Sequence, residues 1–416
     1  MAAQGTCNGV VAWLCMKRSP APRVAALLAT LACTYSCSLL VDTTGLRDGS
    51  GTDGGQTDAA AAGDVGSGDG PSIDGANPGD ANAGDAALVC DGGKSACGQA
   101  CVDLQTDAQN CGRCGRSCGG TGCALGMCNP VTLAMVDKPH GIAVDDTNVY
   151  FTTYMGGGSD FVASVPKNAG KPINKLAQGQ DLPSLLALAN QRVYWTNFTE
   201  GQVVSTGATA VPSVTTTQLP LGSRGAFGIV ADGATEFAVS FESGSVFSIS
   251  PTEIAPTEVG KTAKSATSMA ALNNFLFVAA QSEPGAGLYR VNPATKESTK
   301  LASGAKAWGV ATSGSSVYFS DHVAGTITRI ALSGAATITV IAKNLGAPRG
   351  LAADNTHVYW ADFGTGTIAR VPRDAQAITK EEVIATDLSG VTSIALDDNF
   401  VYFAALNTGV VGKVAK

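Results

Sequence analysis

Seven copies of one short pattern run from His140 to the C-terminus of this 416-residue chain. Each copy begins with a small or polar residue and continues with an apolar run, a polar turn and an aromatic marker. The first copy reads Pro139-His140-Gly-Ile-Ala-Val-Asp145, and Val149-Tyr150-Phe151 follows it. The intervals between markers are 44, 43, 40, 41, 41 and 43 residues, for the markers Tyr150, Tyr194, Phe237, Phe277, Tyr318, Tyr359 and Tyr402.

A repeat of this length predicts one four-stranded sheet per copy, which is the period of a propeller blade. The apolar runs are short, rich in β-branched and aromatic residues, and bounded by Gly, Asn, Asp and Pro, as strands are. In the first copy we expect strands at Ile142–Asp145, Val149–Thr153 and Val162–Val165, and an outer strand such as Ile338–Ala342 precedes the next copy. The sequence therefore predicts an all-β fold, a seven-bladed β-propeller over residues 129–416.

The seventh copy lacks an outer strand, because the chain ends at Lys416 after its third strand. A candidate replacement is Val131–Val136, which stands before the first copy at the place where the other copies keep their outer strand. We predict that this N-terminal strand completes the last blade and latches the ring, which also removes an exposed sheet edge.

The second-strand sequences Val193-Tyr-Trp-Thr-Asn197 and Val358-Tyr-Trp-Ala-Asp362 resemble the YWTD and NHL propeller repeats. The resemblance covers the seven copies, although Phe237 and Phe277 stand where other copies have Tyr. It implies a propeller, and it implies that the Asp of the pattern commonly belongs to a hydrogen-bond network within a loop.

Residues 1–37 resemble a bacterial export leader. Met16-Lys17-Arg18 precedes an apolar run at 24–32, which is shorter than the roughly 20 residues of a membrane span and fits a signal peptide. Met16 is the expected start of translation, and a genuine N-terminal extension is the alternative. The continuation after Cys37 resembles mature bacterial lipoproteins, so Cys37 is the expected lipidation site, with Cys33 second and plain secretion as the rival. We expect an outer-membrane or cell-surface lipoprotein, or else a secreted or periplasmic protein, that meets a membrane only through its lipid anchor.

Residues 38–89 form an acidic linker of Gly, Asp, Ala, Ser and Pro. Eight Asp and no Lys or Arg lie between residues 48 and 89. We expect disorder, because such a segment cannot bury enough apolar surface to offset its ordering entropy. The net charge of -7 also argues against a nucleic-acid partner, since such proteins carry clustered Lys and Arg.

A cysteine-rich module follows at residues 90–128. An even number of cysteines in an exported segment too small for its own core predicts disulfides, and the stretch 101–114 resembles a small module common in secreted bacterial proteins. Zinc at Cys111-Gly-Arg-Cys114 is the alternative. Sequence cannot choose among the 105 pairings of Cys90, Cys97, Cys101, Cys111, Cys114, Cys118, Cys123 and Cys128.

A candidate ligand site follows from the fixed register of the copies. Ten positions before each marker stands a residue that differs from copy to copy; we call these the rim residues, and they are His140, Ser184, Phe227, Thr267, Trp308, Arg349 and Thr392. First strands line the channel of a propeller, so the rim residues should ring one mouth. Three positions after the marker, second strands should return to the same mouth. The candidate ligand-binding residues are therefore His140, Trp308, Asp321, His322, Arg349 and Asp362, which could hold a sugar or small zwitterion by stacking and bidentate hydrogen bonds.

No catalytic residue, metal site or cofactor is predicted, since no nucleophile elbow, metalloprotease motif or phosphate loop occurs. We expect a monomeric, non-enzymatic binding or interaction protein with an unidentified protein, peptide or glycan ligand. Two alternatives remain open: an extracytoplasmic lyase or lactonase that uses His140 and His322, and a structural envelope protein.

Overall fold

The computed structural model describes residues 88–208, 214–220, 224–249, 255–334 and 336–416. These residues lie in the compact unit Asn82–Lys416. The predicted leader, the lipidation sites Cys37 and Cys33, and the linker up to residue 87 lie outside the described residues. No helix within the described ranges has the length and hydrophobicity needed to cross a membrane.

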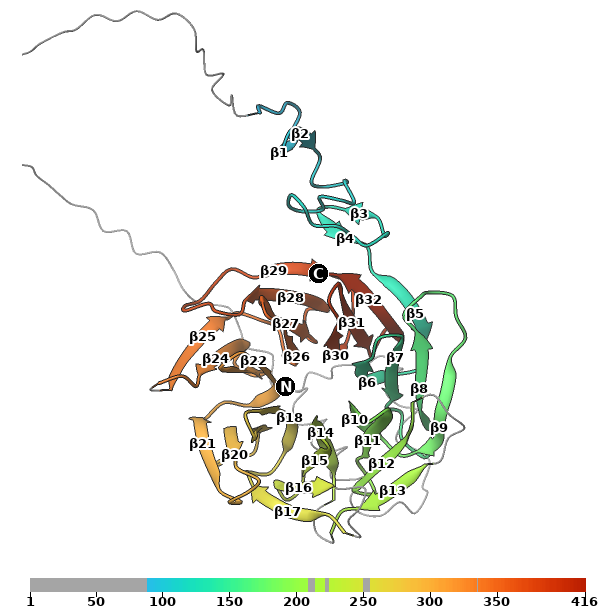
Figure 1. The fold of residues 1–416 in the computed structure, drawn as a ribbon, viewed down its shortest axis with the longest axis vertical. Helices are drawn as coiled ribbons and strands as arrows, with labels where there is room; N and C mark the ends of the chain where they lie inside the picture. The colour runs from blue at the N-terminus through green and yellow to red at the C-terminus, as the bar shows by residue number, and fades with distance from the viewer. Residues whose placement is uncertain (1–87, 209–213, 221–223, 250–254, 335) are drawn as a thin grey trace, which may run out of the picture. The chain divides into compact units, whose positions relative to one another are not determined.

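Seven four-stranded antiparallel sheets stand around one axis (Figure 1), which confirms the predicted seven-bladed β-propeller. Blades 1 to 6 each use four consecutive strands, from the innermost outward. Blade 1 contains β6 (Pro139–Val144), β7 (Asn148–Thr153), β8 (Asp160–Pro166) and β9 (Asn174–Gln180). Blade 2 contains β10 (Pro183–Ala189), β11 (Arg192–Asn197), β12 (Gln202–Gly207) and β13 (Thr215–Gln218). Blade 3 contains β14 (Ala226–Asp232), β15 (Thr235–Ser240), β16 (Ser245–Ile249) and β17 (Thr257–Lys261).

The pattern continues around the ring. Blade 4 contains β18 (Ala266–Leu272), β19 (Phe275–Ala280), β20 (Gly287–Val291) and β21 (Ser298–Ser303). Blade 5 contains β22 (Ala307–Ser313), β23 (Ser316–Asp321), β24 (Thr326–Ala331) and β25 (Thr337–Ala342). Blade 6 contains β26 (Pro348–Ala353), β27 (His357–Asp362), β28 (Thr367–Pro372) and β29 (Glu382–Ala385).

The seventh blade is built from both ends of the propeller. Its sheet order is β30 (Val391–Leu396), β31 (Phe400–Ala405), β32 (Val410–Ala415) and β5 (Val131–Met135). Strand β5 pairs antiparallel with β32, with Ala134 opposite Val411. Leu133 and Ala134 are buried against residues of blades 1 and 7. The predicted N-terminal latch is confirmed.

The marker aromatics form the interfaces between blades. All seven are at most 7 % exposed. Tyr402 of blade 7, for example, belongs to the same buried cluster as Val149 and Phe151 of blade 1. Because every blade buries an aromatic ring against its neighbour, the repeat closes into a ring rather than forming separate sheets.

The cysteine-rich module contains two short hairpins, β1 (Ser95–Cys97) with β2 (Ala100–Val102) and β3 (Cys123–Ala124) with β4 (Met127–Cys128). All eight cysteines of the module form disulfides, as predicted, and the zinc alternative is wrong because no free thiolate is left among them. The bridges are Cys90–Cys101, Cys97–Cys114, Cys111–Cys123 and Cys118–Cys128.

The seam of the propeller, by which we mean blades 6, 7 and 1, contacts the module through blades 6 and 7. The Cys118–Cys128 bridge lies in one buried cluster with Ile384 of β29 and Phe403 of β31. Arg116 is 4 % exposed, and its Nε donates a hydrogen bond of 3.2 Å to the Lys416 carbonyl oxygen. The disulfide module thus covers the blade that the latch closes.

Candidate functional site

A shared backbone device places the rim residues at the channel mouth. Each of the seven first strands has a register shift next to its rim residue, as between Pro139 and Ile142 in β6 and between Pro348 and Leu351 in β26. A bulge of this kind bends the strand and redirects a side chain. It also explains why the first strands begin earlier than predicted, at Pro139 rather than Ile142 in blade 1.

Hydroxyl groups then fix the rim backbone between blades. Five rim carbonyl oxygens each accept a hydrogen bond from a Ser or Thr of the preceding blade. These bonds join Thr152 to Ser184, Thr196 to Phe227, Thr267 to Trp308, Ser320 to Arg349 and Thr392 to His140, over 2.7 to 3.0 Å. Neighbouring first strands approach so closely that a Cβ on Gly309 would collide with the Arg349 carbonyl oxygen. The mouth is therefore rigidly held by the scaffold.

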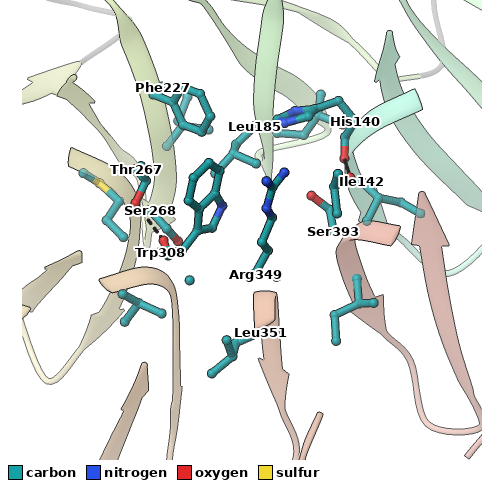
Figure 2. A pocket seen from close by; sticks show the side chains of 18 residues that line it. His140, Ile142, Leu185, Phe227, Thr267, Ser268, Trp308, Arg349, Leu351 and Ser393 are labelled. Atoms are coloured by element: carbon teal, nitrogen blue, oxygen red, sulfur yellow. Dashed lines mark hydrogen bonds between the residues drawn. The ribbon is translucent and has the colours of Figure 1, made fainter. Parts of the chain in front are cut away.

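Six of the seven rim residues line a cavity of about 170 Å³ at this mouth (Figure 2). The seventh, Ser184, is fully buried and does not line it. Two positions after its rim residue, each of the seven blades contributes an apolar side chain to the cavity. These residues are Ile142, Leu186, Ile229, Met269, Val310, Leu351 and Ile394. The site is thus a small cup with an apolar floor and a mixed polar and aromatic rim.

Arg349 supplies the one guanidinium among the residues that line the cup. Its Cζ atom lies 4.6 Å from the ring centroid of Trp308 and 3.6 Å from that of Phe363, within the range of cation–π attraction. Its buried Nε has no hydrogen-bond partner, and none of the ion pairs between described residues includes it. Burial lowers the pKa of Arg349 to about 10, so the group stays charged at neutral pH.

Aromatic rings form a belt beside this charge. Phe227 contacts Trp308 edge to face at 6.5 Å and His140 at 6.0 Å between ring centroids. Phe198 and Phe241 extend the belt behind Phe227. Such rings provide a flat, largely apolar surface on which an aromatic or sugar ring can stack.

His140 is a buried, neutral part of the rim. Its ring stacks on Tyr154 at 4.6 Å, and its Nδ1 has no partner among the described residues. Burial lowers the pKa of His140 to about 4, with a smaller contribution from the Arg349 charge and an opposing one from the Ser184 backbone. The imidazole is therefore uncharged near neutral pH.

The expected cluster of six ligand-binding residues is divided by the structure. His140, Trp308 and Arg349 line the cup, whereas Asp321 and Asp362 do not. Asp321 accepts backbone hydrogen bonds from Lys306, Val323 and Ala324, and Asp362 accepts them from Gly346, Ala347, Gly364 and Thr365. Both carboxylates accept hydrogen bonds from the backbone of nearby loops. The expectation that two carboxylates are available at the rim is therefore wrong, because no carboxylate lies among the residues that line the cup.

His322 stands one shell behind the cup. Its Nδ1 lies 2.9 Å from the Lys306 carbonyl oxygen, and its ring contacts Trp308 at 5.1 Å between centroids. Burial lowers the pKa of His322. His322 does not line the cup, and its contact with Trp308 helps to orient the Trp308 ring.

Apart from His322, sequence reasoning missed a second ring of side chains, four positions after each marker. These residues are Tyr154, Phe198, Phe241, Gln281, His322, Phe363 and Leu406. Most are aromatic, and Tyr154 and Phe363 are the ones that support His140 and Arg349. The constant register of the copies carried this signal, because the same counting that found the rim residues also finds this position.

Comparison with known proteins supports the two described parts separately. Residues 76–131 match the Stigma-specific STIG1-like protein family, a match limited to the cysteine-rich module and its flanks, which supports an extracellular protein. No curated protein matches the chain.

Several solved propellers resemble the chain in fold. A streptogramin B lyase is 17 % identical with a TM-score of 0.58, covering 69 % of this chain and 96 % of its own. The virginiamycin B lyase of Staphylococcus aureus is 16 % identical with a TM-score of 0.59, covering 69 % and 98 %. The WD40 propeller domain of Doa1 is 9 % identical with a TM-score of 0.56, covering 70 % and 96 %. Likeness at these identities establishes the fold alone.

Proposed function

We propose that this protein is an exported, non-enzymatic binding protein that captures an anionic and partly apolar group of its ligand in the cup at the propeller mouth. The observation that carries the proposal is Arg349, a charged guanidinium held over Trp308 and Phe363 without an ion-pair partner among the described residues. A buried charge without a partner costs stability. A ligand carboxylate would provide the missing partner by a bidentate hydrogen bond.

The shape of the cup restricts the ligand. Its volume of about 170 Å³ resembles that of cavities that admit one benzene-sized group, roughly 150 Å³. The apolar floor suits the body of such a group, and the rim suits its charge. This combination fits the acidic end or side chain of a peptide or protein, or an acidic sugar, and the zwitterion considered from the sequence loses its partner carboxylates.

The remaining parts of the chain fit a surface role. We propose that a lipid on Cys37, or on Cys33, anchors the mature protein at the outer membrane or cell surface, and that the YWTD- and NHL-like propeller reaches its ligand as a monomer on the linker 38–89. A secreted or periplasmic protein without the anchor is the alternative. The disulfides of residues 90–128 favour an oxidising compartment.

The test is a binding screen on the full chain that uses matched charged and neutral probes: phenylacetate with phenylacetamide, glucuronate with glucose, and peptides with free or amidated C-termini. Thermal shift reads binding to the folded state. In Arg349→Met, which keeps an apolar stem, affinity for the charged probes should fall roughly 10- to 100-fold, as expected for a lost hydrogen bond to a charge. Arg290→Met is the matched control, since Arg290 lies over Phe275, away from the cup. The proposal would be refuted if no charged probe binds the wild-type protein, or if the charged probes bind the wild type and Arg349→Met with equal affinity.

A lyase or lactonase remains the second candidate, because the unpartnered Nδ1 of His140 is a neutral base near neutral pH. Under this alternative, His140→Ala abolishes turnover of a bound probe and leaves its binding largely intact. Under the binding proposal, no probe is consumed by the wild-type protein.

A further inference from the structure

A second cavity, of about 200 Å³, lies between blades 2 and 3 (Figure 1 shows these blades as β10–β13 and β14–β17). Arg192, Tyr194, Ser205, Thr215, Thr217 and Glu236 supply its polar lining, and Val203 and Ile249 its apolar lining. None of these residues lines the cup at the channel mouth.

Glu236 breaks the pattern of the repeat. It stands one position before the marker Phe237, and the other six blades place an apolar residue there that is at most 1 % exposed: Val149, Val193, Leu276, Val317, Val358 and Val401. Glu236 is equally buried, at 0 % exposed. The scaffold therefore demands an apolar side chain at this position, and blade 3 carries a carboxylate instead.

That carboxylate has no ion-pair partner among the described residues. Neither Oε1 nor Oε2 of Glu236 has a hydrogen-bond partner in the described part of the chain. Burial raises the pKa of Glu236, while the Tyr194 hydroxyl and the Glu236 backbone N–H, as nearby donor groups, and the charge of Arg192 lower it. Leaving such a group buried and unpaired costs stability, and perturbed carboxylates in cavities are typical of functional sites.

Arg192 faces the same cavity from blade 2. One of its terminal nitrogens donates hydrogen bonds to the hydroxyls of Ser205 at 2.9 Å and Thr215 at 3.4 Å. No ion pair between described residues joins Arg192 to Glu236. Two opposite charges thus border one cavity without neutralising each other, and hydroxyl groups stand between them.

We propose that this inter-blade cavity is a binding site for a small zwitterion, a free α-amino acid, whose ammonium group pairs with Glu236 and whose carboxylate pairs with Arg192. Each ligand charge meets the protein charge of opposite sign, and the hydroxyl groups and Tyr194 line the same cavity. Binding resolves the uncompensated carboxylate that the scaffold alone does not explain.

The experiment is isothermal titration of the full chain with glycine, L-alanine and L-serine, each compared with its N-acetyl and amide forms. The free amino acids should bind, and loss of either charge should weaken binding at least tenfold. Glu236→Val, which restores the residue type of the other blades, should raise the melting temperature and abolish binding. Glu236→Gln keeps the shape should the valine variant not fold, and should weaken binding at least tenfold.

Arg290→Met is the control, because Arg290 lies over Phe275 and lines neither cavity, so this variant should leave amino-acid affinity unchanged. Weak ligands bind with dissociation constants of about 1 mM. The inference is overturned if none of the three amino acids binds at a concentration of roughly 10 mM. It is equally overturned if the N-acetyl and amide forms bind as well as the free amino acids, if Glu236→Val still binds them, or if Glu236→Gln binds them within tenfold of the wild type.

Discussion

Charged groups are paired at the seam of the propeller and unpaired at its mouth. At the seam, Glu382 accepts hydrogen bonds from Arg370 and Arg113, and Arg116 lies within 3.6 Å of it. At the mouth, Arg349 and His140 are comparably enclosed and leave buried nitrogens without partners. Both regions use the same strands, since Arg349 and Asp354 stand at opposite ends of β26 and its turn.

The difference separates stability from function. Blades 6, 7 and 1 must hold a ring that the chain closes only through β5, and their ion pairs join segments far apart in the sequence. Lys416 reaches Asp354, and Lys167 of blade 1 reaches Asp397 of blade 7, both at 2.8 Å. None of the ion pairs between described residues includes a residue that lines the cup, so the Arg349 charge is available to a ligand. Loss of seam groups should reduce stability, and loss of mouth groups should reduce binding.

The largest expected effect is on the latch. Leu133→Ala in β5 removes a side chain that is 5 % exposed, and it should lower the free energy of unfolding by about 2 to 5 kcal/mol because a core cavity remains. Met135→Ala in the same strand is the control, since Met135 is 67 % exposed. Calorimetry of both full-length variants is the measurement, and equal melting temperatures would show that β5 is not part of the cooperative unit.

The next effect compares the two regions directly. Glu382→Gln should lower stability by at most about 3 kcal/mol, because it removes the counter-charge of Arg370, which is 2 % exposed, while Glu382 itself is 36 % exposed and partly screened by solvent. Arg349→Met should leave stability unchanged or raise it slightly, since it removes an enclosed charge that has no counter-charge and whose burial costs free energy. Urea denaturation measures both. A mouth variant that unfolds as readily as the seam variant would abolish the distinction between the regions.

Acid should weaken the mouth through His140. The pKa of His140 falls from 6.5 to about 4 on folding. Between pH 6.5 and pH 4 the imidazole is therefore protonated in the unfolded chain and neutral in the folded one. Stability is therefore fully present above pH 6.5 and falls by at most about 3 kcal/mol as the pH drops to 4. His140→Phe should flatten this part of a melting-temperature profile recorded between pH 7 and pH 4. An unchanged slope would mean that His140 is not held neutral.

The smallest effect concerns a single ion pair at the seam. Lys167→Met removes the partner of Asp397, and side chains exposed by 16 % and 24 % predict a loss of about 1 kcal/mol or less. The loss should shrink further in 1 M salt, which screens partly exposed charges. A loss that salt leaves unchanged would indicate that packing of Lys167 on Tyr402, rather than charge, joins these blades.

Much of the fold could be predicted because the marker aromatics recur at nearly constant intervals. Seven markers at constant register gave seven blades, and the missing outer strand after Val410–Ala415 pointed to the residues of β5. The disulfide pairing could not be predicted, because eight cysteines in a short segment leave their partners to the three-dimensional path of the chain.

The site could be predicted only as a set of positions. The register placed Arg349 and Trp308 at one mouth, but it gave no direction for a side chain after its strand ends. Asp321 and Asp362 occupy the expected strand ends, yet they turn to backbone N–H groups of their own loops. Glu236, by contrast, is a carboxylate at a position where the other copies have five valines and a leucine, and a comparison of the copies residue by residue finds it.

The most direct test is a thermodynamic cycle that combines one substitution, Arg349→Met, with one change of ligand, from carboxylate to amide. Affinities of the wild-type protein and of Arg349→Met are measured by Trp fluorescence for phenylacetate and phenylacetamide. The wild type should prefer the carboxylate by at least tenfold and Arg349→Met should show no preference, which corresponds to a coupling free energy of about 1.4 kcal/mol or more. Equal preference in both proteins would contradict this prediction, because the charge at the mouth would then have no part in binding.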